Sequence, residues 1–149
     1  MLLSRASQYT LQALIYLARL PPGQRVMVKD MAAELGLPVF YLGKLVQVPA
    51  RVGWLETARG RGGGVKLAID AKALTLFDIL QLTEGHRVTR ECLLGFKACE
   101  DETACVMHCQ WKPIKQELAA GLGGYTLAAL ASAPLPVWLL AAAETHSGP

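Results

Sequence analysis

The sequence of 149 residues has little charge, few aromatic side chains and no long uninterrupted apolar run. Charged residues make up 18% and aromatic residues 7% of the chain, against 52% hydrophobic residues. This composition is too apolar for an intrinsically disordered protein. The longest apolar stretches are interrupted by Arg19 and by Pro134 and Pro136, so neither supplies the roughly 20 apolar residues of a membrane-spanning helix. We therefore expect one domain with its own hydrophobic core and no membrane partner.

Signals for secretion and for catalysis are lacking as well. Polar residues occupy positions 7–10, where a signal peptide needs an apolar run, and no small-residue cleavage site follows. A cytoplasmic protein is therefore expected. No Ser/His/Asp set and no paired carboxylates at a plausible site stand out, and the acidic run Glu100-Asp101-Glu102 has the composition of a solvated loop. We therefore expect a protein that is not an enzyme.

Basic residues are concentrated in the first half of the chain. Residues 1–75 contain ten Lys or Arg and four Asp or Glu, a net charge of +6, whereas residues 76–149 have a net charge of −3. A basic surface attracts polyanions, so the first half is the candidate region for nucleic-acid contact. A merely uneven surface is the alternative interpretation of the same charges.

All four cysteines lie within eighteen residues, at positions 92, 99, 105 and 109. Disulfides are rare in the cytosol, so such a cluster is more often a metal or redox site than a set of crosslinks. Thiolates bind zinc as well as iron–sulfur clusters, and this spacing matches neither ferredoxin pattern. Cys92, Cys99 and Cys105 form the predicted ligand core, and His108 and Cys109 compete for the fourth position.

The pattern of apolar and turn-forming residues predicts helices in the first half, followed by a hairpin. The predicted elements are helices at 4–20, at 28–36 and from about Pro38 to Gly53 with a bend or break at Pro49, then strands at 54–58 and 65–68. Two helices joined by a short glycine turn and followed by a hairpin form a winged helix-turn-helix. The predicted fold class is mainly α: a winged helix-turn-helix with a two-stranded β-hairpin wing and a C-terminal dimerisation helix.

The predicted hairpin tip, Arg59-Gly60-Arg61-Gly62-Gly63-Gly64, is thin and doubly basic. Glycines allow the backbone to approach another surface closely, and a narrow minor groove attracts arginine. Arg59 and Arg61 are therefore the predicted wing contacts to DNA. On the recognition helix, Lys44 is the predicted basic contact. Tyr41 is a candidate for phosphate contact through its hydroxyl, with a core position for its ring as the alternative.

The second half is expected to carry dimerisation. Trp111, Ile114, Leu118 and Leu122 recur at three- and four-residue spacing, the pattern of one helix face, and Pro113 predicts that this helix starts late or kinks early. Such a stripe suits pairing with a second copy, and core packing within one subunit is the alternative. The predicted domain organisation is a winged helix-turn-helix DNA-binding region at 1–75, a cysteine loop with dimerisation helices at 76–133, and a tail at 134–149.

Roughly residues 1–130 resemble the Rrf-two (BadM-type) family of winged helix-turn-helix transcription regulators. Three segments carry the resemblance: the first helix with Tyr9, Ala13 and Leu17, the entry to the recognition helix at Leu35–Leu42, and the wing at Arg59–Leu67. The sequence also contains the block Cys92-x₆-Cys99-x₅-Cys105-x₂-His108. The wing is the most specific, because it matches the family pattern of Arg-Gly, two variable residues, Gly-Gly, an apolar residue, any residue and Leu. The cysteine block is similar to the cluster-binding branch, the IscR and NsrR type.

The resemblance implies a homodimer on double-stranded DNA, with a recognition helix in the major groove, the wing in the minor groove and a pseudo-palindromic operator. It also implies an iron–sulfur cluster on the cysteines that senses redox state, nitric oxide or cluster supply. Gln8 is a poorer ligand than the acidic residue of the NsrR type, which favours His108 as the fourth ligand, and a 2Fe–2S cluster is favoured over 4Fe–4S. The alternatives are a structural zinc site in a winged-helix protein, or a small iron–sulfur carrier that does not bind DNA.

Overall fold

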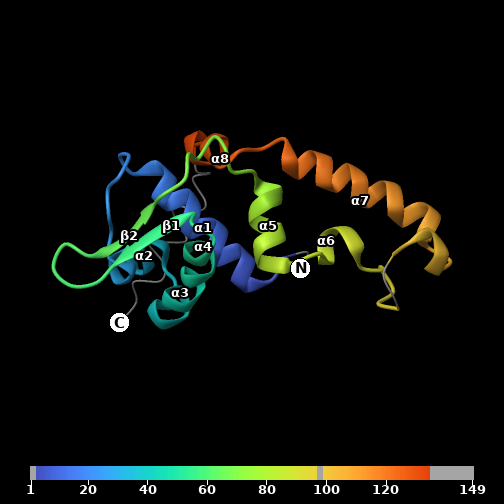
Figure 1. Cartoon of the computed structure of the whole chain (residues 1–149), viewed down its shortest axis with the longest axis horizontal. Helices are drawn as coiled ribbons and strands as arrows, with labels where there is room; N and C mark the ends of the chain where they lie inside the picture. Colours follow the sequence, from blue (N-terminus) through green and yellow to red (C-terminus); the bar gives the residue numbers. More distant parts are fainter. Residues whose placement is uncertain (1–2, 97–98, 135–149) are drawn as a thin grey trace.

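The first half of the chain forms a helical body with a β-hairpin at its edge (Figure 1). In this computed structural model, residues 3–96 and 99–134 are described. The helices of the body are α1 (Arg5–Arg19), α2 (Val28–Leu35), α3 (Val39–Leu45) and α4 (Gln47–Arg51). Helix α1 begins where the Ser4 side chain accepts a hydrogen bond from the Ser7 amide, and α2 ends at Gly36 in the left-handed conformation.

The break in the third predicted helix lies three residues before Pro49. Helix α3 ends at Leu45, Val46 links it to α4, and Pro49 is the third residue of α4. A proline in the first turn of a helix is tolerated because its missing N–H would have no intrahelical partner there. The prediction of a break is therefore confirmed, but Pro49 sits inside the second segment instead of dividing the two.

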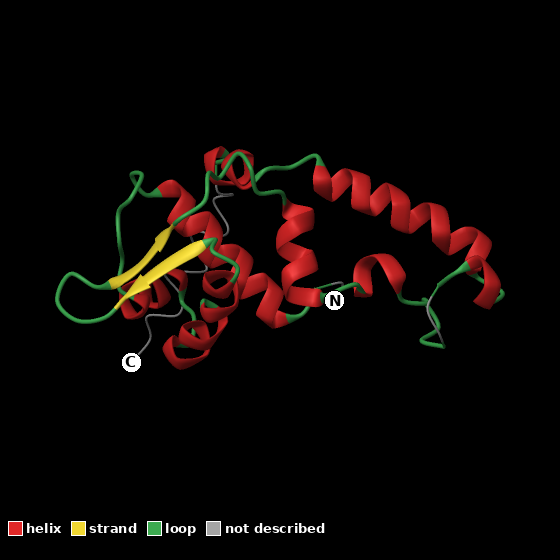
Figure 2. Ribbon diagram, in the orientation of Figure 1, coloured by secondary structure: helices red, strands yellow, loops and turns green. Residues whose placement is uncertain are grey.

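The predicted hairpin is confirmed as β1 (Leu55–Ala58) and β2 (Gly64–Leu67), shown as arrows in Figure 2. The strands are antiparallel, with Leu55 opposite Leu67 and Ala58 opposite Gly64. The amide and carbonyl of Val65 also exchange hydrogen bonds with those of Val26. The hairpin is thus attached on its second strand to the chain between α1 and α2.

The second half continues with α5 (Leu76–Glu84), α6 (Arg87–Arg90), a 3-10 turn at Asp101–Thr103, α7 (His108–Gly123) and α8 (Leu127–Ser132). A capping box formed by Thr75 and Asp78 begins α5. Of the two alternatives given for Pro113, a late start is wrong, because α7 begins five residues earlier, at His108; an early kink stays a prediction. So close to the helix start, the missing N–H of Pro113 removes only one hydrogen bond.

The hydrophobic core lies where α1 packs against the hairpin and against α2, α3, α5 and α8. Its buried members include Leu14, Met31, Leu42, Val65 and Ile79. Helix α8 returns to the body, and the Arg19 guanidinium donates hydrogen bonds to the carbonyl oxygens of Ala131 and Ala133 at the end of α8. The tail expected after Pro134 lies outside the described residues.

The hairpin loop and α7 lie at opposite ends of the longest axis of the molecule (Figure 1). Helix α7 extends away from the body and contacts α5 and α6. Among the helices of the described residues, none has the length and hydropathy needed to cross a membrane.

Candidate functional site

Two residues predicted to contact DNA, Lys44 and Tyr41, lie on α3 and reach the surface. Lys44 is exposed on α3, as the sequence predicts. Tyr41 is 39% exposed, and its ring makes an edge-on contact with the ring of Tyr9, with 5.8 Å between the centroids. Tyr41 therefore takes part in packing and still reaches the surface, and its contact with phosphate stays a prediction.

The wing loop carries Arg59 and Arg61 as exposed side chains between β1 and β2. Its sharp shape needs glycine: a Cβ on Gly63 would lie 2.5 Å from the Ala58 carbonyl oxygen, and one on Gly64 would overlap the backbone of Val26. The glycines therefore let the loop stay thin while it holds two cationic groups in solvent.

Ion pairs hold the base of the wing. The Glu56 carboxylate on β1 pairs with Arg25 and with Lys66. The hydrogen bond from Lys66, assisted by Arg25, lowers the pKa of the Glu56 carboxyl despite the opposing effect of desolvation. These cations are engaged at the base, whereas the cationic side chains at the tip face solvent.

The segment between α6 and α7 brings the four predicted metal ligands together in two pairs. The Sγ atom of Cys92 lies 3.4 Å from that of Cys105, and the Sγ atom of Cys99 lies 3.3 Å from Nδ1 of His108. The three thiols are half-buried, and His108 is 5% exposed. Within residues 3–96 and 99–134, no three or more Cys, His, Asp or Glu side chains form one group able to hold a metal ion. The donors are therefore arranged as pairs.

A carboxylate behind His108 sets the orientation of its ring. Nε2 of His108 lies 2.9 Å from Oδ1 of Asp101, and Nζ of Lys112 lies within 2.9 Å of both Asp101 oxygens. These contacts lower the pKa of the Asp101 carboxyl, with Lys112 the larger cause. An ionised carboxylate can only accept, so Nε2 carries the proton, and in the neutral ring Nδ1 keeps its lone pair toward Cys99.

Cys92 and Cys109 have different surroundings. Hydrogen bonds from the backbone amides of Phe96 and Leu94 lower the pKa of the Cys92 thiol, which favours the thiolate form that binds metals. Cys109 is exposed in the first turn of α7, beside the buried His108. Of the two candidates for the fourth position, His108 is the one that faces another predicted ligand.

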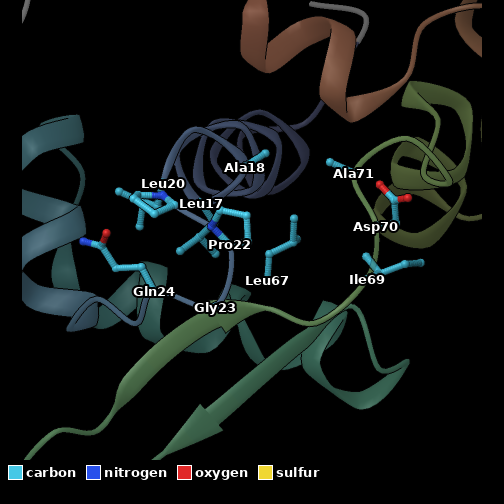
Figure 3. A pocket seen from close by; sticks show the side chains of 11 residues that line it. Leu17, Ala18, Leu20, Pro22, Gly23, Gln24, Leu67, Ile69, Asp70 and Ala71 are labelled. Carbon is cyan, nitrogen blue, oxygen red and sulfur yellow. The ribbon is translucent and has the colours of Figure 1, made fainter.

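A cavity of about 340 Å³ lies elsewhere, between the end of α1, the turn that follows it and the end of β2 (Figure 3). Its lining is aliphatic apart from Gln24 and Asp70, and it contains none of the predicted site residues. A second, open hollow of about 570 Å³ lies beside the cysteine segment and is lined in part by Cys105 and Phe96. This hollow gives solutes an approach to one of the donor pairs.

Comparison with known proteins assigns the chain to a family. The family model Rrf2, described as an iron-dependent transcriptional regulator, matches residues 3–133. The chain belongs to the Rrf2 family. Protein aau3 of Rhizobium meliloti (strain 1021) is 30% identical to this Rrf2 protein over 129 residues, which cover 85% of this chain and 82% of that protein.

Two solved structures share the fold of this Rrf2 protein. CymR (YrzC), the global cysteine regulator of B. subtilis, has a TM-score of 0.73 and 27% identity, covering 87% of this chain and 95% of that one. IscR of T. potens has a TM-score of 0.67 and 25% identity, covering 91% of this chain and 94% of that one. The predicted family and the predicted mainly α, winged helix-turn-helix fold are confirmed, whereas dimerisation through the C-terminal helix stays a prediction. This Rrf2 protein is a transcription regulator, not an enzyme.

Sequence reasoning missed two side chains of the candidate sites. Asp101 was assigned to a solvated loop, and nothing in the sequence links it to a histidine seven residues later. No single-sequence pattern marks Phe40 as a contact, although it stands four residues before Lys44, a spacing that places both on one helix face.

Proposed function

We propose that this Rrf2 regulator binds double-stranded DNA as a homodimer and senses a chemical signal through an iron–sulfur cluster held by Cys92, Cys99, Cys105 and His108. The observation that carries the proposal is the pairing of these donors, Cys92 with Cys105 and Cys99 with His108. The same chain exposes the wing arginines in its first half. The DNA-binding part and the sensing part have separate tests.

The DNA-binding part rests on the exposed cations of the first half. Lys44 lies on the recognition helix, and Arg59 and Arg61 lie on the wing, so a duplex contacted by both elements would meet positive charge in two places. Phosphate contacts provide affinity and its salt dependence, and arginines on a thin loop suit a narrow minor groove. A pseudo-palindromic operator follows from two-fold symmetry of a homodimer.

The sensing part rests on the chemistry of the donor set. Three thiols and an imidazole are ligands that iron–sulfur clusters use, and Rieske centres show that histidine can replace cysteine. A 2Fe–2S cluster needs two protein ligands for each of its two irons. The arrangement of the four donor side chains in two pairs therefore favours 2Fe–2S over 4Fe–4S. On this basis Cys92 and Cys105 would hold one iron, and Cys99 and His108 would hold the other.

The chain's own residues prepare the site in three ways. The amides of Phe96 and Leu94 stabilise the Cys92 thiolate, and the Asp101 carboxylate keeps Nδ1 of His108 directed at Cys99. His108 is also the first residue of α7, so a change at the cluster acts directly on that helix. When bound, the cluster supplies a centre that reacts with oxidants or nitric oxide, and its loss releases these ligands.

The DNA-binding part is tested with the variant Arg59→Ala/Arg61→Ala. It should lose on the order of 1–3 kcal/mol of binding free energy at a specific site, and binding of the parent should fall steeply with salt. Fluorescence anisotropy with genomic fragments measures both effects. Arg87→Ala, which removes an exposed arginine of α6, is the matched control. Salt-insensitive binding, or a double variant that binds like the parent, would contradict DNA contact through the wing.

The sensing part is tested with five alanine variants, at Cys92, Cys99, Cys105, His108 and Cys109, each purified without oxygen. The first three should lose the visible absorption of the cluster. His108→Ala should keep a perturbed and less stable cluster, and Cys109→Ala should resemble the parent. Iron and sulfide analysis accompanies the spectra. A colourless parent with stoichiometric zinc would refute the cluster, and colour lost in Cys109→Ala but kept in His108→Ala would reverse the ligand assignment.

A further inference from the structure

The exposed face of the recognition helix includes a large apolar side chain. Phe40 is 92% exposed, the highest value among the large hydrophobic side chains of the described residues. Lys44 and Gln47, both exposed, follow it at four- and seven-residue spacing, which places the three on one face because Val46 keeps helical dihedral angles between α3 and α4. Leu42 and Val46 point the other way, into the core.

Gly43 completes this face. It lies three residues after Phe40, and a Cβ built on it would meet no atom within 4 Å. The surface between Phe40 and Lys44 therefore has no side chain that would keep another molecule away from the backbone. A flat or convex partner can approach the helix closely at this point.

The charge around Phe40 indicates the class of partner. A single exposed phenyl ring is common on protein surfaces, but this one lies one helical turn from Lys44 and in a half of the chain with a net charge of +6. A polyanion complements this charge better than an apolar protein surface does. The apolar group that a duplex offers in its major groove is the C5-methyl of thymine, which phenylalanine is able to contact.

We propose that Phe40 is a specificity-determining residue, whose ring packs on the methyl group of one thymine in each half-site of the operator. The proposal rests on the proposed DNA binding and adds to it the base that is read and the group that reads it. Lys44 then reaches a phosphate or a guanine on the same side, and the open surface at Gly43 allows the helix to sit deep enough for the ring to reach the methyl group.

The experiment begins with selection from a random duplex library by the full chain, purified without oxygen, in parallel with Phe40→Ser and Val39→Ser. Val39 is the neighbouring exposed apolar residue, 43% exposed, and lies about a quarter-turn away on the helix. In the selected duplex, each thymine is then replaced by deoxyuridine, which removes only the methyl group. Affinity is measured by fluorescence anisotropy, and circular dichroism checks the fold of each variant.

Selected half-sites should contain thymine at one fixed position, and deoxyuridine there should weaken binding of the parent about fourfold for each half-site, the factor for burial of one methyl group. Val39→Ser should lose the same affinity on deoxyuridine substitution as the parent, and Phe40→Ser should lose none. A third variant, Phe40→Leu, should show a smaller loss of affinity than the parent. If the parent shows no thymine preference, or if Phe40→Ser keeps the preference unchanged, the proposed role of Phe40 is overturned but the proposed DNA binding is not. A parent that enriches no sequence and binds no duplex in a salt-dependent way would overturn the proposed DNA binding as well.

Discussion

Asp101 has a specific role in the structure that its acidic neighbours in the sequence do not indicate. It lies between Glu100 and Glu102 in an acidic run, yet it alone joins the His108 ring to the Lys112 ammonium group. A carboxylate behind a ligating histidine fixes the tautomer and the ring orientation and raises the basicity of the ligand. Under the proposed function, Asp101 is therefore a positioning residue for the fourth ligand.

Removing this carboxylate should weaken cluster retention. We expect Asp101→Ala to lose its cluster to a chelator faster than the parent, because the loss of a group that orients a metal ligand usually lowers metal affinity about 10- to 100-fold. The decay of visible absorbance under anaerobic EDTA measures this rate. Glu100→Ala removes the same charge from the same loop and should decay like the parent. Equal decay of the Asp101→Ala variant and the parent would show that the histidine needs no such support.

The first helix shows which residues the apolar pattern placed correctly. Ala13, Leu14 and Leu17 are buried on one face of α1, but the start of the buried face is made by Ser7 and Thr10. Polar residues are not expected in a core, and here Ser7 is buried because its hydroxyl donates to the Glu84 carboxylate, 77 residues away. A partner so distant in the sequence leaves no periodic signal, which is why sequence reasoning could not find this contact.

At the scale of elements, the start of α1 is joined to the end of α5. The Glu84 carboxylate accepts hydrogen bonds from the Ser7 hydroxyl and from the Ser4 amide, the latter at 2.7 Å. Partial burial raises the pKa of Glu84, but the hydrogen bonds from Ser7 and Ser4 outweigh it, so the pKa is lowered. Gly85 follows at once and leads to the cysteine segment, so this junction connects the DNA-binding body to the sensing part.

A lowered pKa makes this junction sensitive to acid. A carboxyl with a lower pKa in the folded state stabilises the protein above its unfolded pKa, and that contribution is lost as the pH falls through the folded pKa. Glu84→Gln should lower the free energy of unfolding by about 1 kcal/mol at pH 7. The effect is smaller than for a fully buried carboxylate, because solvent screens the half-buried Glu84 side chain. The difference should shrink below about pH 4.3.

Urea unfolding at pH 7 and at pH 3.5 measures this dependence. Glu91→Gln is the control, because Glu91 pairs with Arg87 on the surface, with side chains 62% and 70% exposed, and such pairs contribute less than about 1 kcal/mol. A Glu84→Gln effect of the same size at both pH values would show that the charge of Glu84 does not stabilise the junction.

Helix ends that depend on neighbouring residues can be read from a sequence, whereas helix ends that depend on tertiary contacts cannot. Ser4, Gly36 and the Thr75–Asp78 pair mark helix ends through hydrogen bonds or dihedral angles that depend on neighbouring residues. The start of α7 at His108 and the short helix α6 have no cap made by a side chain. Their limits depend on the packing of the cysteine segment, and a single sequence does not contain that information.

At the scale of the whole molecule, α7 lacks the packing that a helix of its length needs. It has 16 residues, and only His108 and Lys115 among them are buried. Of the stripe predicted to pair with a partner, Ile114 is 50% exposed and Trp111, Leu118 and Leu122 are half-buried. The adjoining cysteine segment exposes further apolar side chains, at Leu93, Leu94, Phe96 and Val106. A second copy of the chain that covers this surface would give α7 its missing contacts.

Dimerisation through α7 is therefore expected, and it would link the cluster to the spacing of two recognition helices. The chain has a mass of 16.1 kDa, and sedimentation at micromolar concentration should give about twice this value for the parent. Ile114→Glu should shift the mass toward that of the monomer, because a charge in an apolar interface is not solvated. Gln116→Glu adds the same charge to an exposed position of α7 and should remain dimeric.

The same variants separate dimerisation from DNA contact. Ile114→Glu leaves every proposed DNA-contacting residue in place, so its affinity for a single half-site should equal that of the parent, whereas its affinity for a palindromic site should fall to the half-site value because two linked contacts become independent. Anisotropy with half-site and palindromic duplexes of equal length measures both quantities. A parent that sediments as a monomer at tens of micromolar would rule out the dimer. An Ile114→Glu variant that stays dimeric would place the interface on another surface than this stripe.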